Sequence, residues 1–290
     1  MRTYPDCYPC FMRQALEASR TVGATQEEQL HLLRKVMQQL LRLDTDCTPP
    51  EIGQAVHRMV RAQTGVDDPY FQLKAYSTER ALALYPRLQR MVREAKDPFT
   101  CAVRLAIAGN IIDFAQANTT DKVNSLWPYV EETLRQPFTV DHTQALSEAL
   151  STSREVLFLA DNAGETVFDR ILIENIEIPT RYVVKGGPTI NDAVADDARQ
   201  AGIHRIAEVV SSGSDAPGTL LKDCSPEFLH EFRKASVIIA KGQGNYETLS
   251  DIRAPIFFLL KIKCPVIAKD MRLGTGSIIC KRSEHYFTRP

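Results

Sequence analysis

Hydrophobic positions in the first half of the chain recur at the spacing of amphipathic helices. Two of these patterns begin at a capping signal, because Thr25 precedes Glu28 by three residues and Thr48 precedes a proline pair and Glu51. The helical patterns run over Leu30–Leu41, Ile52–Val60, Phe71–Arg93 and Pro98–Ala117. We predict no strand before residue 150, so the first half is expected to be helical.

The pattern changes after residue 150, where short apolar runs alternate with helical stretches. The runs typical of strands are Val156–Ala160, Arg181–Lys185, Ile206–Val210, Val237–Ala240, Ile256–Leu260 and Pro265–Ala268. Helical patterns lie between most of them, including Asp192–Ala201 and Pro226–Lys234, the latter capped by Ser225. This alternation predicts right-handed crossovers and a mostly parallel sheet. We therefore expect two domains, a helical domain over 1–150 and an α/β domain over 151–290 that carries the functional site.

Three loops that follow predicted strands are rich in polar residues. They are Asp161–Glu165, Lys185–Asp192 and Lys241–Glu247. In a parallel sheet the carboxyl ends of the strands share one edge, where α/β proteins bind ligands. Asp161, Asn162 and Asp192 could then share one divalent cation. Carboxylate and amide oxygens suit Mg²⁺ or Mn²⁺, with Co²⁺ or Ni²⁺ as further candidates, and the lack of nearby His or Cys disfavours zinc.

The third loop adds groups that suit an anion. Lys241 brings a positive charge, while Gly242 and Gly244 allow backbone N–H groups to approach a phosphate. A cation, a lysine and a glycine-rich loop are the parts that phosphoryl chemistry needs. An alternative is that Asp161-Asn162 and Asn191-Asp192 are ordinary turn or helix-cap residues.

Two other segments have both a functional and a structural interpretation. Asn110 and Asp113 are three residues apart, so they would share a helix face, as functional groups or as a solvated stripe. The small-residue loop Ser211–Gly218 could be a substrate lid or a flexible connection.

Cys7 and Cys10 form a CxxC motif near the N-terminus. This spacing suits half of a metal site or a redox pair, with Cys47 or Cys101 as possible partners of a metal. Two unrelated buried thiols are the alternative interpretation.

Composition limits the class of protein. The 290 residues are 44% hydrophobic and 24% charged, which is typical of a globular chain. A formal net charge of −1 argues against binding to nucleic acid or to an anionic membrane surface. The sequence contains no 18-residue apolar run, and its N-terminus lacks the apolar core of a signal peptide. Seven cysteines in a chain of this length favour a reducing cytoplasm over a secreted disulfide scaffold.

The polar motifs together resemble a known family. The segments FLADNAGE, KGGPTIND, GSDAPG and AKGQGNYE, preceded by AGNIID, are similar to those of the DUF89 family of metal-dependent phosphatases. Members of this family are described as damage-control phosphatases of small phosphometabolites, and the CxxC resembles its archaeal and bacterial branch. The resemblance implies a helical N-terminal region followed by a Rossmann-like, mostly parallel α/β/α sandwich.

The resemblance also implies roles for single residues. It places metal ligands at Asp161, Asn162 and Asp192. It places groups that face the phosphate or the substrate at Lys241, Asn245, Glu165, Asn110 and Asp113.

We therefore expect a metal-dependent phosphomonoesterase whose partner is a small phosphorylated metabolite. Sugar phosphates, phosphopantetheine-like molecules and nucleotides are all candidates. Asp161 could hold the cation or attack phosphorus itself. Two other functions stay open at this point: a transferase that uses a nucleotide or adenosyl cofactor, and a non-catalytic protein that binds a metal or a metabolite.

Overall fold

The computed structural model describes residues 1–42, 46–110 and 126–287. The helices that precede the main strands are α1 (Cys7–Thr21), α2 (Gln26–Leu40), α3 (Pro49–Thr64), α4 (Phe71–Glu94), α5 (Pro98–Gly109), α7 (Leu126–Arg135) and α8 (Thr143–Thr152). Both predicted helix starts are confirmed, with Thr25 as the N-cap of α2 and Thr48 as the N-cap of α3. Helix α5 ends at Gly109, and the rest of its predicted extent, 111–117, lies outside the described residues. None of the described helices is both long enough and apolar enough to cross a membrane.

The second part of the chain builds one seven-stranded sheet. Its strands are β1 (Val140–Asp141), β2 (Val156–Leu159), β3 (Thr180–Val184), β4 (Glu208–Ser211), β5 (Ile238–Lys241), β6 (Ile256–Lys261) and β7 (Ile278–Arg282), in the order β1-β7-β6-β5-β2-β3-β4. The five strands from β6 to β4 are parallel, whereas β7 is antiparallel to β6 and β1 is parallel to β7. The remaining elements are α9 (Thr166–Ile173), α10 (Ala195–Gln200), α11 (Pro226–Lys234), α12 (Gly242–Leu249), α13 (Pro265–Met271) and α14 (Glu284–Phe287), with the 3₁₀ turns η2 (Ile203–Arg205) and η3 (Leu221–Asp223).

Three predictions about local structure were wrong. The run Pro265–Ala268 begins helix α13 instead of a strand, because Pro265 occupies the first helical turn, where its missing N–H costs nothing. Strand β1 lies before residue 150, and strand β7 was not predicted at all. The alternative interpretation of Asp192 as a helix cap does not hold either, because the cap position of α10 is Val194.

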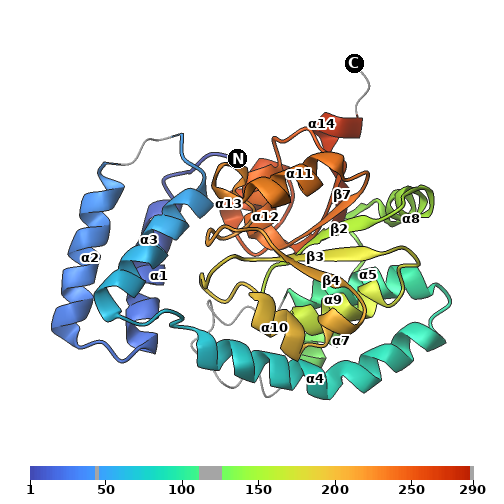
Figure 1. Cartoon of the computed structure of the whole chain (residues 1–290), viewed down its shortest axis with the longest axis horizontal. Helices are drawn as coiled ribbons and strands as arrows, with labels where there is room; N and C mark the ends of the chain where they lie inside the picture. Colours follow the sequence, from blue (N-terminus) through green and yellow to red (C-terminus); the bar gives the residue numbers. More distant parts are fainter. Residues whose placement is uncertain (43–45, 111–125, 288–290) are drawn as a thin grey trace.

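Helices cover both faces of the sheet, so the α/β sandwich is confirmed. Helices α1 to α3 form a group beside the sheet, and α4, α5, α7 and α9 lie along one of its faces (Figure 1). One apolar core joins α4, α5, α7, α8 and α9 to one face of the sheet, and a second core joins α1, α2, α3 and α11 to α13 to the other. Each core contains residues from both sides of position 150, and the division into domains over 1–150 and 151–290 stays a prediction.

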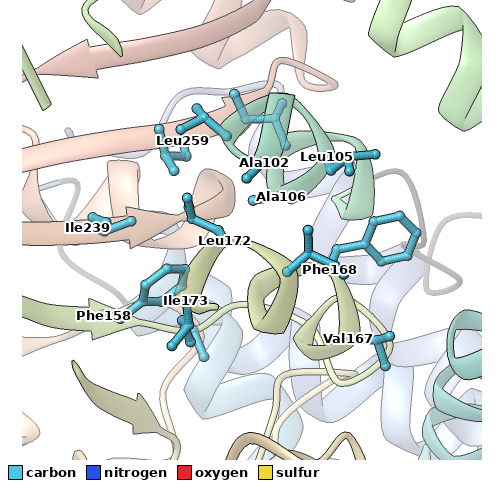
Figure 2. Packing of buried hydrophobic residues seen from close by; sticks show 14 of the residues in the cluster. Ala102, Leu105, Ala106, Phe158, Val167, Phe168, Leu172, Ile173, Ile239 and Leu259 are labelled. Atoms are coloured by element: carbon cyan, nitrogen blue, oxygen red, sulfur yellow. The ribbon is translucent and has the colours of Figure 1, made fainter. Parts of the chain in front are cut away.

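Helices α5 and α9 pack closely near the candidate site. Figure 2 shows Ala102, Leu105 and Ala106 of α5 facing Phe168 and Leu172 of α9. Gly109, the last residue of α5, lies too close to α9 for a side chain. A Cβ at this position would lie 2.7 Å from Cβ of Phe168. This approach brings the C-terminal end of α5 to the first turn of α9.

The sheet reverses its winding direction between two central strands. From β2 the chain continues to β3 and β4 on one side, whereas β5 and β6 lie on the other side. The adjacent carboxyl ends of β2 and β5 therefore form a topological switch point, which is where open α/β sheets bind ligands. Asp161 follows β2 directly and Lys241 is the last residue of β5.

His57 of α3 is expected to make the protein sensitive to acid. Its ring is buried beside Tyr70, and burial, with a smaller effect of the Arg61 charge, lowers its pKa to about 4. An unfolded histidine titrates near pH 6.5. The unfolded state therefore gains protons first, and the free energy of unfolding should fall as the pH drops from 6.5 toward 4, by about 3 kcal/mol in total.

Urea denaturation at pH 7 and pH 4.5 measures this effect. The His57→Leu variant should lose less stability between the two pH values than the wild-type protein. His230→Leu, which changes an exposed histidine of α11, is the matched control and should keep the wild-type pH dependence. Equal losses for His57→Leu and the wild type would contradict the prediction.

Candidate active site

Backbone hydrogen bonds join the loop after β2 to the loop after β3. Asn162 and Asp192 form an isolated antiparallel bridge, and the N–H of Ala193 donates to the Asp161 carbonyl at 2.8 Å. The Asp161, Asn162 and Asp192 side chains are all buried. The three residues that we predicted as metal ligands are thus brought together by backbone pairing.

Four side chains converge next to this bridge. Asn110 Nδ2, from the end of α5, donates to Asp161 Oδ2 at 2.7 Å and to Glu165 Oε2 at 3.1 Å. Asn162 Nδ2 donates to the same two oxygens, at 2.8 and 3.2 Å. Two amides therefore bridge one pair of buried carboxylates. Among the predicted residues, Asn110 and Glu165 belong to this cluster, whereas Asp113 lies outside the described residues.

The cluster suits an oxygen-liganded cation. Asn110 Oδ1 is buried and has no hydrogen-bond partner among the residues that the structure describes. Rotating a side-chain amide by half a turn exchanges its NH₂ group for its oxygen with almost no change of shape. The oxygens of Asn110 and Asn162 would then lie beside the Asp161 and Glu165 carboxylates, as in the all-oxygen shell that Mg²⁺ and Mn²⁺ favour. Within the described ranges no three His, Cys, Asp or Glu side chains are grouped to hold a metal, so a cation here would depend on the amide oxygens.

Lys241 lies beneath this cluster and is fully buried. Its Nζ donates to the Ala106 carbonyl at 2.9 Å, to Glu165 Oε1 at 2.5 Å and to Asp169 Oδ1. Burial alone would lower the pKa of Lys241, but the Asp169 and Glu165 carboxylates raise it above its ordinary value. The three hydrogens of the ammonium group are all used in this arrangement. The phosphate contact that we predicted for Lys241 stays a prediction, and it would require the ammonium to leave one of these acceptors.

Asp169 was missed by the sequence analysis. It lies one helical turn after Glu165 on α9, and its Oδ2 accepts a 2.7 Å hydrogen bond from Tyr182 Oη. Burial, opposed by the Lys241 charge, raises the pKa of Asp169 to about 6. The four-residue spacing from Glu165 was the signal that could have revealed it, since both carboxylates then point from one helix face.

Carboxylates predominate among the buried charged residues that the structure describes at the site. These carboxylates outnumber the buried ammonium groups by two: Asp161, Glu165, Asp169 and Asp192 against Lys185 and Lys241. Excess buried charge of one sign is costly unless a counter-ion compensates it. A divalent cation carries the charge that is needed.

Gly242 allows the Asp161 carboxylate to approach helix α12. Its φ is 76°, and a Cβ at this position would lie 1.9 Å from Asp161 Oδ2. No other residue type fits here, and the carboxylate gains from the positive end of the helix. The space above Gly242 that we predicted for a phosphate is therefore shared with Asp161.

Asn245 ties three segments together. Its Nδ2 donates to the carbonyls of Ala160 and Lys241 at 3.1 and 2.7 Å, and its Oδ1 accepts from Thr219 Oγ1 at 2.7 Å. Through these contacts α12 is held to the end of β2, to the end of β5 and to the segment that contains Thr219. The phosphate roles of Asn245 and Gly244 stay predictions.

The loop Ser211–Gly218 is held against helix α3. Asp215 accepts hydrogen bonds from Gln54, Arg58 and Arg61, and Gly186 N donates to Ser214 O at 2.8 Å. No pattern in the sequence indicated that α3 would contact this loop. The contacts fix the loop beside the second polar loop of the site.

The CxxC motif lies at the start of α1. Cys7 is a buried free thiol whose pKa is raised by burial, and the Cys10 thiol accepts a 3.5 Å contact from Gln14 Nε2. No group of three His, Cys, Asp or Glu residues suited to a metal includes either cysteine in the part of the chain that the structure describes. A second metal or redox site at Cys7 and Cys10 stays a prediction.

Comparison with known proteins decides the family. The family model described as "Damage-control phosphatase ARMT1-like domain" matches residues 3–279. The chain belongs to this DUF89 family of damage-control phosphatases. The resemblance that the polar motifs suggested is thereby confirmed.

Three relatives match between 79% and 96% of the chain. "Damage-control phosphatase PH1575" of Pyrococcus horikoshii is 36% identical over 96% of this chain and 98% of its own length. "Damage-control phosphatase" of Archaeoglobus fulgidus is 33% identical over 79% of this chain and 81% of its own length. A third relative, "Uncharacterized protein MJ0202" of Methanocaldococcus jannaschii, is 34% identical over 96% and 95% of the two chains. The names of the first two relatives support a phosphatase role in metabolite repair.

A solved DUF89 structure matches the fold. The crystal structure of the P. horikoshii protein superposes with a TM-score of 0.88 at 33% identity, over 98% of this chain and 100% of that chain. The predicted fold class, an α/β sandwich with a helical N-terminal region, is confirmed.

Proposed function

We propose that this phosphatase is a metal-dependent phosphomonoesterase that acts at the β2–β5 switch point. The observation that carries the proposal is the convergence of Asn110, Asp161, Asn162 and Glu165, whose buried carboxylates and amides offer the oxygen ligands that a divalent cation prefers. Mg²⁺ or Mn²⁺ is the proposed cation, with Co²⁺ or Ni²⁺ as alternatives.

The protein groups have distinct roles in this proposal. When bound, the cation would neutralise phosphate oxygens and favour attack at phosphorus. Asp161 and Asp192 would hold the cation, together with the amide oxygens of Asn162 and Asn110. Glu165 Oε2 would lie beside the rotated amide oxygens as a further oxygen near the cation, while Lys241 holds its other oxygen, Oε1. A ligand role is favoured for Asp161 over a nucleophilic role, because both amides already orient its Oδ2 into the cluster.

The substrate is proposed to be a small phosphorylated metabolite. Relatives named damage-control phosphatases support this class, and sugar phosphates, phosphopantetheine-like molecules and nucleotides remain its candidate members. The loop Ser211–Gly218 flanks the site and is a proposed source of substrate selectivity. A cytoplasmic location stays a prediction.

Metal removal is expected to stop the enzyme and to lower its thermal stability. The protein would be stripped with EDTA and then assayed on a panel of these phosphate esters with Mn²⁺, Mg²⁺, Co²⁺ or Ni²⁺. We expect turnover to return with Mn²⁺ or Mg²⁺, and the melting temperature to rise with metal alone because the cation neutralises the excess charge. Enzyme assays and differential scanning fluorimetry measure the two effects.

Other outcomes point to other functions. Full turnover in excess EDTA would contradict metal dependence. Stabilisation by an adenosyl cofactor alone, without a response to metal, would favour a transferase. Metal binding without turnover on the whole panel would favour a non-catalytic binding protein.

A further inference from the structure

Two buried lysines border the site, and they differ in how their hydrogens are used. Lys241 donates to three acceptors, two of which are carboxylates. Lys185, the residue after β3, donates to one acceptor within the described part of the chain, the Gly218 carbonyl. Its second neighbour is Asp192 Oδ2 at 3.4 Å, which is an ion-pair distance but long for a good hydrogen bond.

Lys185 lies on the side of the site that the loops after β2 and β3 form. Its backbone N–H donates to the Ala193 carbonyl at 2.9 Å, so it is fixed beside Asp192. Asp192 in turn pairs with Asn162 through the backbone bridge. The Lys185 ammonium therefore neighbours Asp192, a proposed ligand of the cation, and the Lys185 side chain is only 4% exposed.

The Gly218 carbonyl sets the direction of the Lys185 side chain. Gly218 has a φ of 68° and is pressed against helix α12, since a Cβ there would lie 2.1 Å from the Gly244 carbonyl oxygen. The loop that ends at Gly218 is held in place by Arg58 and Arg61 through Asp215. The position of the Lys185 ammonium is thus defined by the fold.

A phosphate monoester changes the charges around this lysine. A divalent cation bound at Asp192 would take over the carboxylate that Lys185 now faces. Phosphate oxygens beside that cation would then be the acceptors nearest to the free hydrogens of Lys185, and a charge-assisted bond to ammonium is favourable there. If Lys241 turned to bind the phosphate, it would leave the buried carboxylate of Glu165 or Asp169 without its ammonium partner.

We propose that Lys185, and not Lys241, is the side-chain cation that binds the substrate phosphate, an inference that rests on the proposed phosphatase function. Lys185 would touch a phosphate oxygen on the Asp192 side of the cation. Lys241 would stay beneath the site, where it holds Glu165 and Asp169.

Binding of Mn²⁺ and of inorganic phosphate, each measured by calorimetry on the full chain, tests this inference. In the Lys185→Met variant, phosphate affinity at saturating Mn²⁺ should fall more than about tenfold. Mn²⁺ affinity should stay the same or increase, because a positive charge 3.4 Å from Asp192 is lost. Lys222→Met, which changes a largely exposed lysine on η3, is the control and should leave both affinities unchanged.

The possible outcomes test the role of Lys185 separately from the proposed phosphatase function. Phosphate affinity within about twofold of the wild type in Lys185→Met would overturn the role of Lys185 and leave the phosphatase proposal intact. A large loss of Mn²⁺ affinity would also overturn it, since Lys185 would then only support the structure. A wild-type protein that binds neither Mn²⁺ nor phosphate would overturn both proposals. If Lys185→Met does not fold, Lys185→Gln, which can still donate to Gly218, provides the same comparison.

Discussion

The Asp161→Asn substitution is expected to abolish Mn²⁺ binding and to lower phosphatase turnover by about a thousandfold or more. Asp161 Oδ2 accepts from both Asn110 and Asn162, and its carboxylate lies against Gly242 at the start of α12. An asparagine keeps this shape but removes the negative charge of the carboxylate. The cation would then lose its central anionic ligand, and the phosphate would lose the charge that neutralises it.

Stability distinguishes loss of function from loss of fold in this variant. Without metal, Asp161→Asn should melt at the same temperature as the wild type or higher, since the substitution removes a negative charge that is buried beside the Glu165 carboxylate. Asp196→Asn is the matched control, because it makes the same change at an exposed site on α10. Calorimetry with Mn²⁺, a turnover assay and thermal unfolding cover the three effects. Turnover near the wild-type rate in Asp161→Asn would remove this residue from the mechanism.

The Lys241→Met substitution is expected to destabilise the protein by about 3–5 kcal/mol, the usual cost of leaving a buried charge unpaired. Lys241 is the shared partner of Glu165 and Asp169, and both carboxylates are completely buried. The folded protein can reduce this cost only by taking up protons. We therefore expect the loss of stability to be larger at pH 8 than at pH 6, since the Asp169 pKa is already raised by burial in the wild type.

A second substitution makes this prediction specific. Adding Asp169→Asn to Lys241→Met should restore part of the lost stability, because one of the two stranded charges disappears. Urea denaturation of the single and double variants measures the recovery. A stable Lys241→Met protein with weakened phosphate binding would instead support the phosphate role that the sequence predicted for Lys241.

Much of the fold could be predicted from the sequence because the signals are local. Thr25 caps α2 through its own side chain, and Ser225 begins α11 at the predicted residue. The central strands are apolar on both faces, as in Leu157 and Phe158, which is typical of a buried parallel sheet. The two strands that were not predicted lie outside this parallel set. Strand β7 lies antiparallel beside β6, and β1 has only two residues, which are too few to show a hydrophobic period.

The site could be predicted only as a set of loops. Parallel strands bring their carboxyl ends to one edge, so the sequence could indicate that Asp161, Asp192 and Lys241 lie near one another. It could not give the direction of a side chain. Lys241 is the last residue of β5, and the pleat of the strand directs its ammonium to the buried helices α5 and α9. The contact of Lys185 with Gly218 depends on tertiary packing that no spacing encodes.

The pairing of β1 with β7 has a consequence for synthesis on the ribosome. Val140 pairs with Ile279, so about 140 residues must be translated after β1 before its partner strand exists, which takes on the order of 10 s. Helices α1 to α5 emerge earlier still, and the sheet that covers their apolar faces is made afterwards. The nascent chain therefore exposes hydrophobic helices for most of its translation, and its folding in the cell should depend on chaperones that bind such surfaces until the last strand has left the ribosome.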